Sequence, residues 1–495
     1  MPKFVLLWTD AVIWLGLAAT LGYAWHVRRQ PQLAATWRKV WRDAAAMAAT
    51  VLLLAFAAVA LLDSLHFRRA LPPLPGQAAG QVFYATRTES LLDVLLTPLV
   101  ERRESTYSRP LSYLGFTRES RVVNGEPQRI HPRLEHAGAH LTDPENDWLG
   151  DLALRGALGL AGGLIAAGLL GLAALPLLRR WEPALAGLNL SAAARQVLAD
   201  RTDLPWRAGV ITLAVLGALT GAAVGLSTGY HVLGTDNLGN DVLYQALKSL
   251  RTAFVIGVMA SVATLPFAIA LGILAGWYRG WVDEVIQYVY TVLSSVPNVL
   301  LIAACVLMVQ VFLDKHPELF ETGAERADLK IFMLCLILGL TGWAGLCRLL
   351  RGETLKLREL DYVQAATAFG VAPLRIMRRH ILPNVMHLVL INTVLDFSGL
   401  ILYEAVLSYV GVGVDPSMNS FGGMINLGRD QMSRDPLIWW SFSAAFVFMV
   451  ALVLAANLFA DGVRDAFDPR ARSLRPRWRS TSRTAAAAQT GGAGA

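Results

Sequence analysis

The chain has 495 residues, of which 55% are hydrophobic and only 16% are charged, and its mean hydropathy is +0.45. Because an ordinary soluble domain carries about 25% charged residues, a purely soluble protein is excluded. The formal net charge of +7 comes mostly from basic residues that flank apolar blocks. This pattern indicates orientation in a bilayer rather than a nucleic-acid-binding face.

Long apolar stretches predict nine membrane spans, because about 20 apolar residues are needed to cross the hydrocarbon layer. In chain order they cover residues 4–25, 44–65, 152–178, 208–226, 253–278, 285–313, 331–350, 385–410 and 437–460. The predicted fold class is an all-α polytopic membrane protein. Cys305, Cys335 and Cys347 fall inside these spans, so we expect neither a disulfide nor a metal site from them.

The charges of the connecting segments predict the orientation of the spans. The linker 26–43 is basic, so the positive-inside rule places it in the cytoplasm and the N-terminus outside. Segment 66–150 then lies outside; it is also rich in Arg, but loops longer than about 60 residues escape the rule. We therefore expect a multi-pass protein of a bacterial inner membrane with a cytoplasmic C-terminus. The first apolar run is expected to be a span rather than a cleaved signal peptide, because no A-x-A site follows it.

Two segments outside the spans have patterns of their own. In 66–150, Thr86–Glu89 fits a capping box before the apolar run 91–100 and predicts a helix within a small insert. His131, Glu135, His136 and His140 are near one another, but no HExxH motif is present and a solvated loop is favoured over a metal site. The basic, Ala- and Gly-rich segment 469–495 is expected to be a disordered tail that touches lipid.

The loop before the eighth predicted span has a helix–turn–helix pattern. From Asp361 it reads DYVQAATAFGVAPLRIMRRHILPN. Gly370 can end the first helix in the left-handed conformation, and Pro373 suits the start of the second. Leu374, Met377 and Ile381 share one edge of that second helix. Such an edge fits either the groove of a partner or a lipid surface.

These residues resemble the cytoplasmic signature of the permease subunits of ABC importers. That signature has Glu-Ala-Ala, then Gly after three residues, and Leu-Pro about a dozen positions further on; here Gln364 replaces the Glu, so a salt bridge from that position is not implied. In the family this segment is the coupling helix, which sits in a cleft of the ATP-hydrolysing subunit. The resemblance thus implies an ATPase-coupling loop of Gln364, Ala365, Ala366, Gly370, Pro373, Leu374, Met377, Ile381, Leu382 and Pro383.

Further motifs resemble the peptide-importer branch of that family. Residues 231–243 read HVLGTDNLGNDVL and are similar to HPLGTDxxGRDVL, with Val232 in place of Pro and Asn240 in place of Arg. Residues 280–284, 340–351 and 404–413 are similar to later segments. The resemblance covers about residues 205 to 470 and implies a six-helix permease core after about three additional spans. The implied domains are 1–65, 66–150, 151–206, 207–468 and 469–495.

Two irregular segments and two charged residues inside a span are candidates for the transport pathway. Irregular Gly- and Asn-rich backbone cannot face lipid, so 231–241 and 411–423 must lie in water or line a cavity. We expect an outer gate there, with ordinary turns as the alternative; its residues are His231, Gly234, Thr235, Asp236, Gly239, Asp241, Gly411 and Gly413. Asp396 and Glu404 lie in a span, where a charge costs about 2.5 to 3.5 kcal/mol, and are pore candidates unless they only make structural hydrogen bonds. Asp10 is assigned no role.

The resemblance implies a non-catalytic permease subunit of an ATP-driven importer for peptides or related solutes. No Lys follows a Gly, so a GxxxxGK[ST] loop is absent. We expect no catalytic residue, bound metal or cofactor in this chain, with ATP and Mg²⁺ used by two ATPase subunits. A second permease subunit in a heterodimer, a periplasmic solute-binding protein and lipid complete the expected partners. The alternatives are an ion-coupled secondary transporter using Asp396 or Glu404 and a membrane-bound sensor or enzyme based on 66–150.

Overall fold

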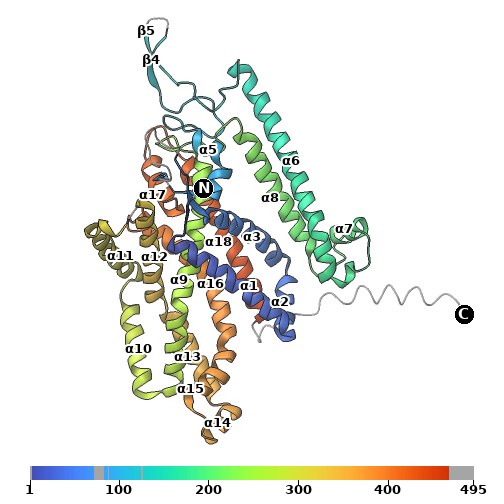
Figure 1. Ribbon diagram of the computed structural model, residues 1–495, viewed down its shortest axis with the longest axis vertical. Helices are drawn as coiled ribbons and strands as arrows, with labels where there is room; N and C mark the ends of the chain where they lie inside the picture. Colours follow the sequence, from blue (N-terminus) through green and yellow to red (C-terminus); the bar gives the residue numbers. More distant parts are fainter. Residues whose placement is uncertain (1–2, 72–82, 87, 124–125, 321, 468–495) are drawn as a thin grey trace, which may run out of the picture.

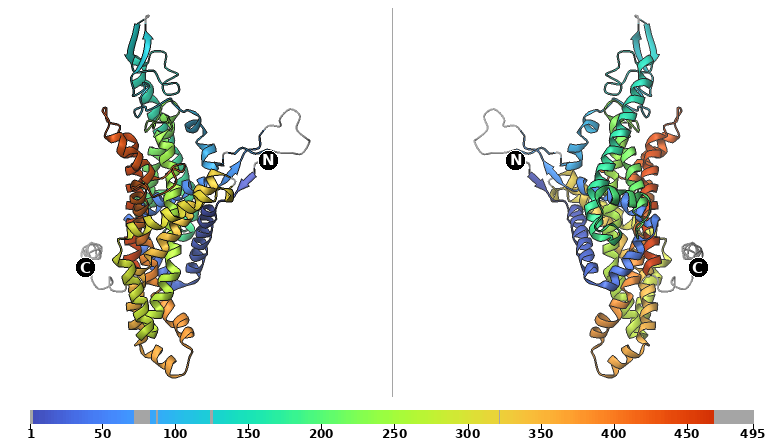
Figure 2. Two further views of the ribbon diagram at one scale, coloured as in Figure 1. Left: turned by 90° about the vertical axis from the view of Figure 1, so that its left-hand side faces the viewer. Right: turned by 90° about the vertical axis from the view of Figure 1, so that its right-hand side faces the viewer.

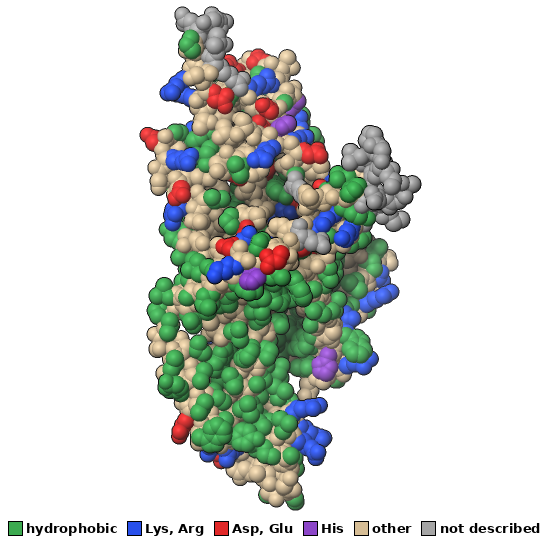
Figure 3. Space-filling view, turned by 60° about the vertical axis from the view of Figure 1, so that its left-hand side comes forward, with side chains coloured by type: hydrophobic (Ala, Val, Ile, Leu, Met, Phe, Trp, Pro, Cys, Tyr) green, Lys and Arg blue, Asp and Glu red, His purple; other side chains and the backbone are tan. Residues whose placement is uncertain are grey.

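The computed structural model of the chain describes residues 3–71, 83–86, 88–123, 126–320 and 322–467. The molecule is elongated and largely helical, with a β-hairpin at one end and a short helical loop at the other (Figures 1 and 2). On the face drawn in Figure 3, hydrophobic side chains form a broad band, and charged side chains gather above it. The predicted tail 469–495 lies outside the described residues.

The N-terminal extension, residues 3–205, contains the insert 66–150. Its elements are β1 (Lys3–Val5), α1 (Trp8–Arg29), α2 (Pro31–Trp41), α3 (Ala44–Asp63), β2 (His66–Arg68), β3 (Glu89–Ser90), α4 (Leu91–Leu95), α5 (Thr97–Glu101), β4 (Glu119–Val123), β5 (Glu126–Ile130), α6 (Pro144–Trp181) and α7 (Leu190–Leu198). Strands β1, β2 and β3 form one antiparallel sheet in that order, and β4 and β5 form the hairpin.

The core follows from residue 206. It consists of α8 (Trp206–Ser227), α9 (Val242–Tyr278), α10 (Gly280–Ser295), α11 (Asn298–Lys315), α12 (Gly323–Gly342), α13 (Ala344–Arg358), α14 (Asp361–Ala368), α15 (Pro373–Ile376), α16 (Leu382–Tyr409), α17 (Phe421–Met432) and α18 (Trp440–Phe467). One π-helical turn, Met377–Ile381, joins α15 to α16. Helix α9 is central and packs against α12, α13, α16, α3 and α1.

Among the described residues, eight helical segments are long and apolar enough to cross a membrane, and they belong to α3, α6, α8, α9, α11, α12–α13, α15–α16 and α18. The predicted span 4–25 corresponds to α1, which is not among them. Asp10 and the Trp, Thr, Gly and Tyr residues along the helix keep its mean hydropathy too low. The predicted span 285–313 is divided into α10 and α11, because Pro297 interrupts the helix between them.

Side-chain caps set several of the helix starts. Asp241 accepts hydrogen bonds from the backbone N–H groups of Leu243 and Tyr244, so α9 begins eleven residues earlier than its predicted apolar stretch. The helix predicted after Thr86 is present as α4, but its capping box is formed by Ser90 and Asp93. The predicted box at Thr86–Glu89 was therefore wrong by one turn, because Ser-x-x-Asp satisfies the same pattern closer to the apolar run.

Helices α6 and α8 form a closely packed antiparallel pair. A Cβ on Gly163 would lie 1.9 Å from the carbonyl oxygen of Gly217, and one on Gly159 would lie 2.4 Å from that of Gly221. Small residues at four-residue intervals let two backbones approach within a membrane. The pair stands beside the rest of the bundle and connects the insert to α7 (Figure 1).

Candidate functional site

The predicted coupling loop is a helix, a glycine turn and a second short helix. Helix α14 ends before Gly370, whose φ of +74° is the left-handed conformation that glycine favours. The N–H of Val371 bonds to the carbonyl of Ala366 at 3.1 Å, which closes the end of α14. Pro373 then begins α15. The loop lies at the end of the molecule opposite the insert (Figure 1).

The apolar edge predicted for this loop needs a correction. Leu374 is 72% exposed, but Met377 and Ile381 are buried against α9, α13 and α16 together with Ile376. The reason is that the chain leaves regular α-helical geometry in the π turn after Ile376, which moves these side chains away from the edge of Leu374. The most exposed large apolar side chains of the loop are Phe369, at 87%, and Leu374.

Gln364, the departure from the family signature, lies beside a carboxylate. Its side-chain amide is 3.4 Å from Glu359 Oε2 and 3.3 Å from the Glu359 carbonyl oxygen. Glu359 also receives a hydrogen bond from Arg279, whose Nη2 lies 2.5 Å from Oε1. A glutamate at position 364 would place two negative charges next to each other, whereas the neutral amide donates to Glu359.

An ion pair joins two motifs that are distant in sequence, between the coupling loop and the rest of the helical bundle. Asp283, from the GWVDE segment at the start of α10, accepts hydrogen bonds from Arg351 Nε at 2.5 Å and Nη2 at 2.7 Å. This bidentate pair fixes α10 against α13. Since α13 leads directly into α14, the pair joins the loop to the helical bundle.

The outer loop, residues 229–241, contacts the insert at two glycines. Gly234 and Gly239 have φ values of +74° and +76°. A Cβ on Gly234 would lie 2.5 Å from the Ser108 carbonyl oxygen, and one on Gly239 would lie 1.8 Å from that of Glu104. Both positions therefore need glycine for conformation and for space.

His231 lies between two carboxylates and is 3% exposed. Its Nδ1 is 2.7 Å from Asp241 Oδ2, at the cap of α9, and its Nε2 is 3.5 Å from Glu104 Oε1, in the insert. Burial alone would lower the pKa of His231, but the hydrogen bond to Asp241 and the nearby carboxylates of Asp241 and Glu104 outweigh it and raise the pKa to about 9. The imidazolium thus connects the insert to the start of the central helix.

Glu104 also organises the insert. Its carboxylate accepts hydrogen bonds from the backbone N–H groups of Glu135, His136 and Ala137 at 2.9 to 3.1 Å. Burial would raise the pKa of Glu104, but the His231 ring 3.5 Å away and these three N–H donors lower it to about 2. Glu104 is therefore ionised wherever the protein is folded near neutral pH.

Thr235 and Asp236 hold the rest of the outer loop. Thr235 Oγ1 accepts from the Ser108 N–H at 2.7 Å, and its carbonyl accepts from Trp440 Nε1 at 2.9 Å. Asp236 accepts from the backbone N–H of Asn240 and from the Asn240 side chain. The loop is thus bonded to the insert on one side and to α18 on the other.

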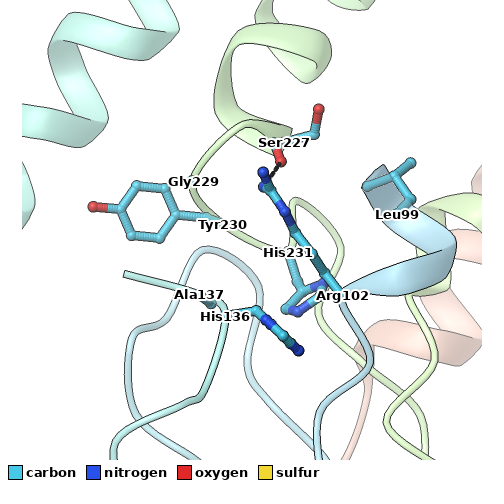
Figure 4. Close-up of a pocket in the computed structure, with 8 residues that line it drawn as sticks. All are labelled: Leu99, Arg102, His136, Ala137, Ser227, Gly229, Tyr230 and His231. Carbon is cyan, nitrogen blue, oxygen red and sulfur yellow. Dashed lines mark hydrogen bonds between the residues drawn. The ribbon is translucent and has the colours of Figure 1, made fainter. Parts of the chain in front are cut away.

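A small cavity marks the contact between the insert and the outer loop (Figure 4). It is lined by Leu99, Arg102, His136, Ala137, Ser227, Gly229, Tyr230 and His231. The guanidinium of Arg102 donates to the carbonyl oxygens of Ser227 at 3.0 Å and Thr228 at 2.7 Å. The cavity is no larger than about one water molecule, so it is a packing feature of this contact rather than a pocket for a solute.

The second predicted gate segment, 411–423, packs on the end of α16. Gly411 has a φ of +88°, and a Cβ on Gly413 would lie 1.9 Å from Ser408 Oγ. That hydroxyl donates to Glu404 Oε1 at 2.7 Å, and Glu404 also accepts from Ser420 and from the Gly422 backbone. Glu404 is thus buried at the joint between α16 and the start of α17.

The two pore candidates lie in different surroundings. Asp396 is exposed on the surface of α16 and accepts a hydrogen bond from Asn392, one turn earlier. Glu404 is 2% exposed and faces α17. The structure does not bring them together, so they do not form one ion site.

The histidines of the insert serve separate contacts. His131 Nδ1 lies 3.0 Å from the Gly115 carbonyl oxygen, and His140 Nε2 lies 2.7 Å from Asp151 Oδ2. The backbone N–H groups of Glu135 and His136 bind Glu104. Within the part of the chain that the structure describes, no group of three or more His, Cys, Asp or Glu side chains could hold a metal ion.

Sequence reasoning missed the residues that attach the extension to the core. Asp10, assigned no role, pairs with Arg251 Nη2 at 2.5 Å, and His66 Nδ1 lies 2.8 Å from the other oxygen of Asp10. Lys248 lies 2.9 Å from Asp93 and 3.3 Å from Asp63. The sequence did contain one indication of these ion pairs. Lys248 and Arg251 are two cations within the first turns of an apolar helix, and such cations need buried partners.

Comparison with known proteins identifies the family of the core. Residues 268–473 match the family described as binding-protein-dependent transport system inner membrane component. The oligopeptide transport system permease protein OppC of Mycobacterium tuberculosis is 34% identical over 245 residues, which are 50% of this chain and 78% of that protein. The glutathione transport system permease protein GsiD of Pectobacterium atrosepticum is 32% identical over 243 residues, 49% of this chain and 74% of that protein.

The chain therefore belongs to the family of inner membrane components of binding-protein-dependent transport systems, the permeases of ABC importers. It is a multi-pass inner membrane protein. Within that class it is similar to the permeases of peptide transport systems, as the dipeptide permease DppC of Lactococcus lactis also indicates, at 31% identity over 241 residues, 49% of this chain and 64% of that protein. Residues 1–267 lie outside the family match.

Proposed function

We propose that this chain is the pore-forming permease subunit of an ATP-driven importer for peptides or related solutes, and that it couples to separate ATPase subunits. The observation that carries the proposal is the coupling loop. It lies beyond the helical bundle at the end opposite the insert and exposes Phe369 and Leu374 (Figure 1). Large apolar side chains displayed together on a loop are typical of a partner contact.

In this proposal the insert lies outside the cell and the coupling loop lies in the cytoplasm. The N-terminus is outside and the C-terminus is inside, as the basic linker 26–43 predicts. The ATPases bind ATP and Mg²⁺, and this chain supplies no catalytic group. Moving a two-state pore from 1:99 to 99:1 takes about 5.5 kcal/mol, which nucleotide binding and hydrolysis can provide.

The outer parts of the molecule divide into a fixed and a movable segment. The outer loop 229–241 is bonded to the insert through Glu104 and Ser108, so it serves as the fixed side of the gate. Segment 411–423 turns on Gly411, where a Cβ would meet no atom within 4 Å, and serves as the movable side. A solute-binding protein docks on this face, and a second permease subunit covers the exposed Asp396.

Transport assays with the assembled complex test the proposal against an ion-coupled transporter. Uptake of a labelled oligopeptide into proteoliposomes should require ATP on the cytoplasmic side and should continue when an uncoupler removes the proton gradient. Uptake that needs the gradient and no ATP would refute the proposal and favour coupling at Asp396.

The coupling loop can be tested separately. Replacing both Phe369 and Leu374 with Ser should reduce co-purification of the ATPase subunits at least tenfold, because the apolar contact is lost, while membrane insertion is unchanged. The matched control is Leu319→Ser, which changes another exposed Leu, on a turn after α11. Equal loss in the control, or full ATPase recruitment by the double variant, would contradict the assignment.

A further inference from the structure

A cluster of basic residues lies outside both regions described above. It is formed by the end of α1, by α2, by the end of α6 and by residues 195–207, and we call it the basic collar. Its members are Arg28, Arg29, Arg38, Lys39, Arg42, Arg179, Arg180, Arg195, Arg201 and Arg207. The same segments, 26–43 and 179–207, contain four acidic residues, so the collar has a formal net charge of +6.

Direct contacts bring these segments together. The guanidinium of Arg28, from α1, lies 4.5 Å from the ring centroid of Trp181, at the end of α6. Arg38, from α2, lies 3.2 Å from Asp203, just before α8. These two contacts bring residues that are far apart in the sequence together.

The acidic residues of these segments are largely occupied elsewhere. Glu182 is 1% exposed and accepts from the backbone N–H of Asp203, and Asp43 caps α3 through the N–H of Ala45. Among the described residues, Arg38 is the collar member with a carboxylate within ion-pair distance. Arg28, Arg29, Lys39 and Arg42 are exposed, so most of the positive charge is available to an external anion.

Helix α2 is amphipathic, with its apolar side against the protein and its charged side exposed. Its apolar side packs on α18, where Val40 is fully buried and Trp37 lies 5.5 Å from Phe467, measured between ring centroids. Its other side exposes Arg38, Lys39 and neighbouring cations. Aromatic side chains beside arginines are typical of the headgroup layer, and the guanidinium of Arg29 lies 3.5 Å from the ring centroid of Trp25.

The position of the basic collar relative to the membrane-spanning helices also places it at a membrane surface. The membrane-spanning candidates α3, α6 and α8 each have one end at the insert or the outer loop and the other end at the collar. The collar is thus at the membrane surface opposite the insert. It is also separate from α14 and α15, which lie further along the molecule (Figure 1).

We propose that the basic collar binds the phosphate-bearing headgroups of anionic phospholipids. Arginine forks match phosphate oxygens in pairs, and several cations at one surface sum their attraction. The bound lipid holds α1, α2 and α6 together where the protein itself leaves like charges side by side. A peptide segment of an ATPase is not the occupant, because the exposed contact for that partner is on the coupling loop.

Lipid titration of the full-length protein in detergent micelles tests the proposal. Phosphatidylglycerol should raise the midpoint of thermal unfolding, and native mass spectrometry should detect the bound lipid. In R29Q/R42Q, half-maximal stabilisation should need about 25-fold more phosphatidylglycerol, since each basic residue near an anionic surface contributes about 1 kcal/mol, or about fivefold. Phosphatidylcholine with the same acyl chains should have no such effect in either protein.

The matched control is R118Q/R129Q, which removes two exposed arginines from the insert and should leave the response unchanged. High salt should weaken the effect of phosphatidylglycerol on the unaltered protein, a measurement that does not depend on the folding of a variant. The proposal is overturned if R29Q/R42Q responds like the unaltered protein, if the control loses as much, or if inorganic phosphate stabilises as well as the lipid. Loss of ATPase binding in R29Q/R42Q with unchanged lipid binding would overturn it in favour of a protein partner.

Discussion

At the scale of single residues, His231 determines how the outer loop is held. Its ring joins Asp241, which caps the central helix α9, to Glu104 of the insert. The loop departs from the family pattern at Asn240, yet the side chain of Asn240 still donates to Asp236 at 3.1 Å. The shorter residue therefore keeps a polar contact within the loop.

The pKa values of this pair predict a pH window for the attachment of the insert. Glu104 has a folded-state pKa of about 2, below its ordinary 4.5, so its contribution is complete above pH 4.5 and is lost as pH falls toward 2. His231 has a folded-state pKa of about 9, above its ordinary 6.5, so its contribution is complete below pH 6.5 and is lost as pH rises toward 9. The attachment should therefore be tightest between about pH 4.5 and 6.5.

Hydrogen exchange of the amides of residues 229–241, corrected for intrinsic rates, measures this window. Protection should fall as pH rises from 6.5 to 9 in the unaltered protein. In Glu104→Gln the fall should begin at lower pH, because His231 loses one of its two carboxylates. In His231→Gln the alkaline fall should be absent, and its persistence would show that another group is responsible.

Sequence patterns identified His231 and Asp241 as a motif but did not identify Glu104. The motif residues are ten positions apart, whereas Glu104 belongs to the insert and meets them only through the tertiary fold. The same limit applies to Asp10, whose partner Arg251 is on a helix far along the chain. Ion pairs between distant segments leave no periodic signal in one sequence.

At the scale of elements, the spacing of glycines makes α6 and α8 a pair. We predict that Gly163→Val lowers the unfolding midpoint of the protein in detergent, by an overpacking cost of about 1 to 3 kcal/mol, because its Cβ would overlap the Gly217 backbone. Gly162→Val is the matched control, since a Cβ there meets no atom within 4 Å. Equal midpoints for the two variants would show that the α6–α8 contact does not contribute to stability.

Apolar length and turn residues predicted most elements, and local chemistry changed the rest. Helix α9 extends beyond its predicted start because Asp241 caps it and because Lys248 and Arg251 are neutralised by the extension. The predicted span 285–313 is not a single helix, because Pro297 divides it into α10 and α11. The edge of Leu374, Met377 and Ile381 assumed a regular helix, and the π turn at Met377–Ile381 breaks that spacing.

At the scale of the whole molecule, buried charges make the extension part of the permease. Replacing Arg251 with Met removes the guanidinium beside the buried carboxylates of Asp10 and Asp328 and should destabilise the protein by about 3 to 5 kcal/mol. The double variant R251M/D10M should recover part of that loss, because the Asp10 carboxylate is then removed together with its guanidinium partner, whereas Asp328, 3.8 Å from Arg251, loses its cation in both variants. The unfolding midpoint in detergent is the measurement, and losses that simply add would contradict a direct coupling between the two residues.

The pairing of Arg251 and Lys248 with the extension also bears on how the protein is assembled during synthesis. The carboxylates of Asp10, Asp63 and Asp93 precede α9 in the chain and leave the ribosome before it. Lys248 and Arg251 would otherwise hinder the entry of α9 into the bilayer. Their counter-ions have already been synthesised when that helix emerges. A truncated gene that starts at α8 would produce a chain whose central helix arrives without them, and we expect the cell's quality-control proteases to remove it.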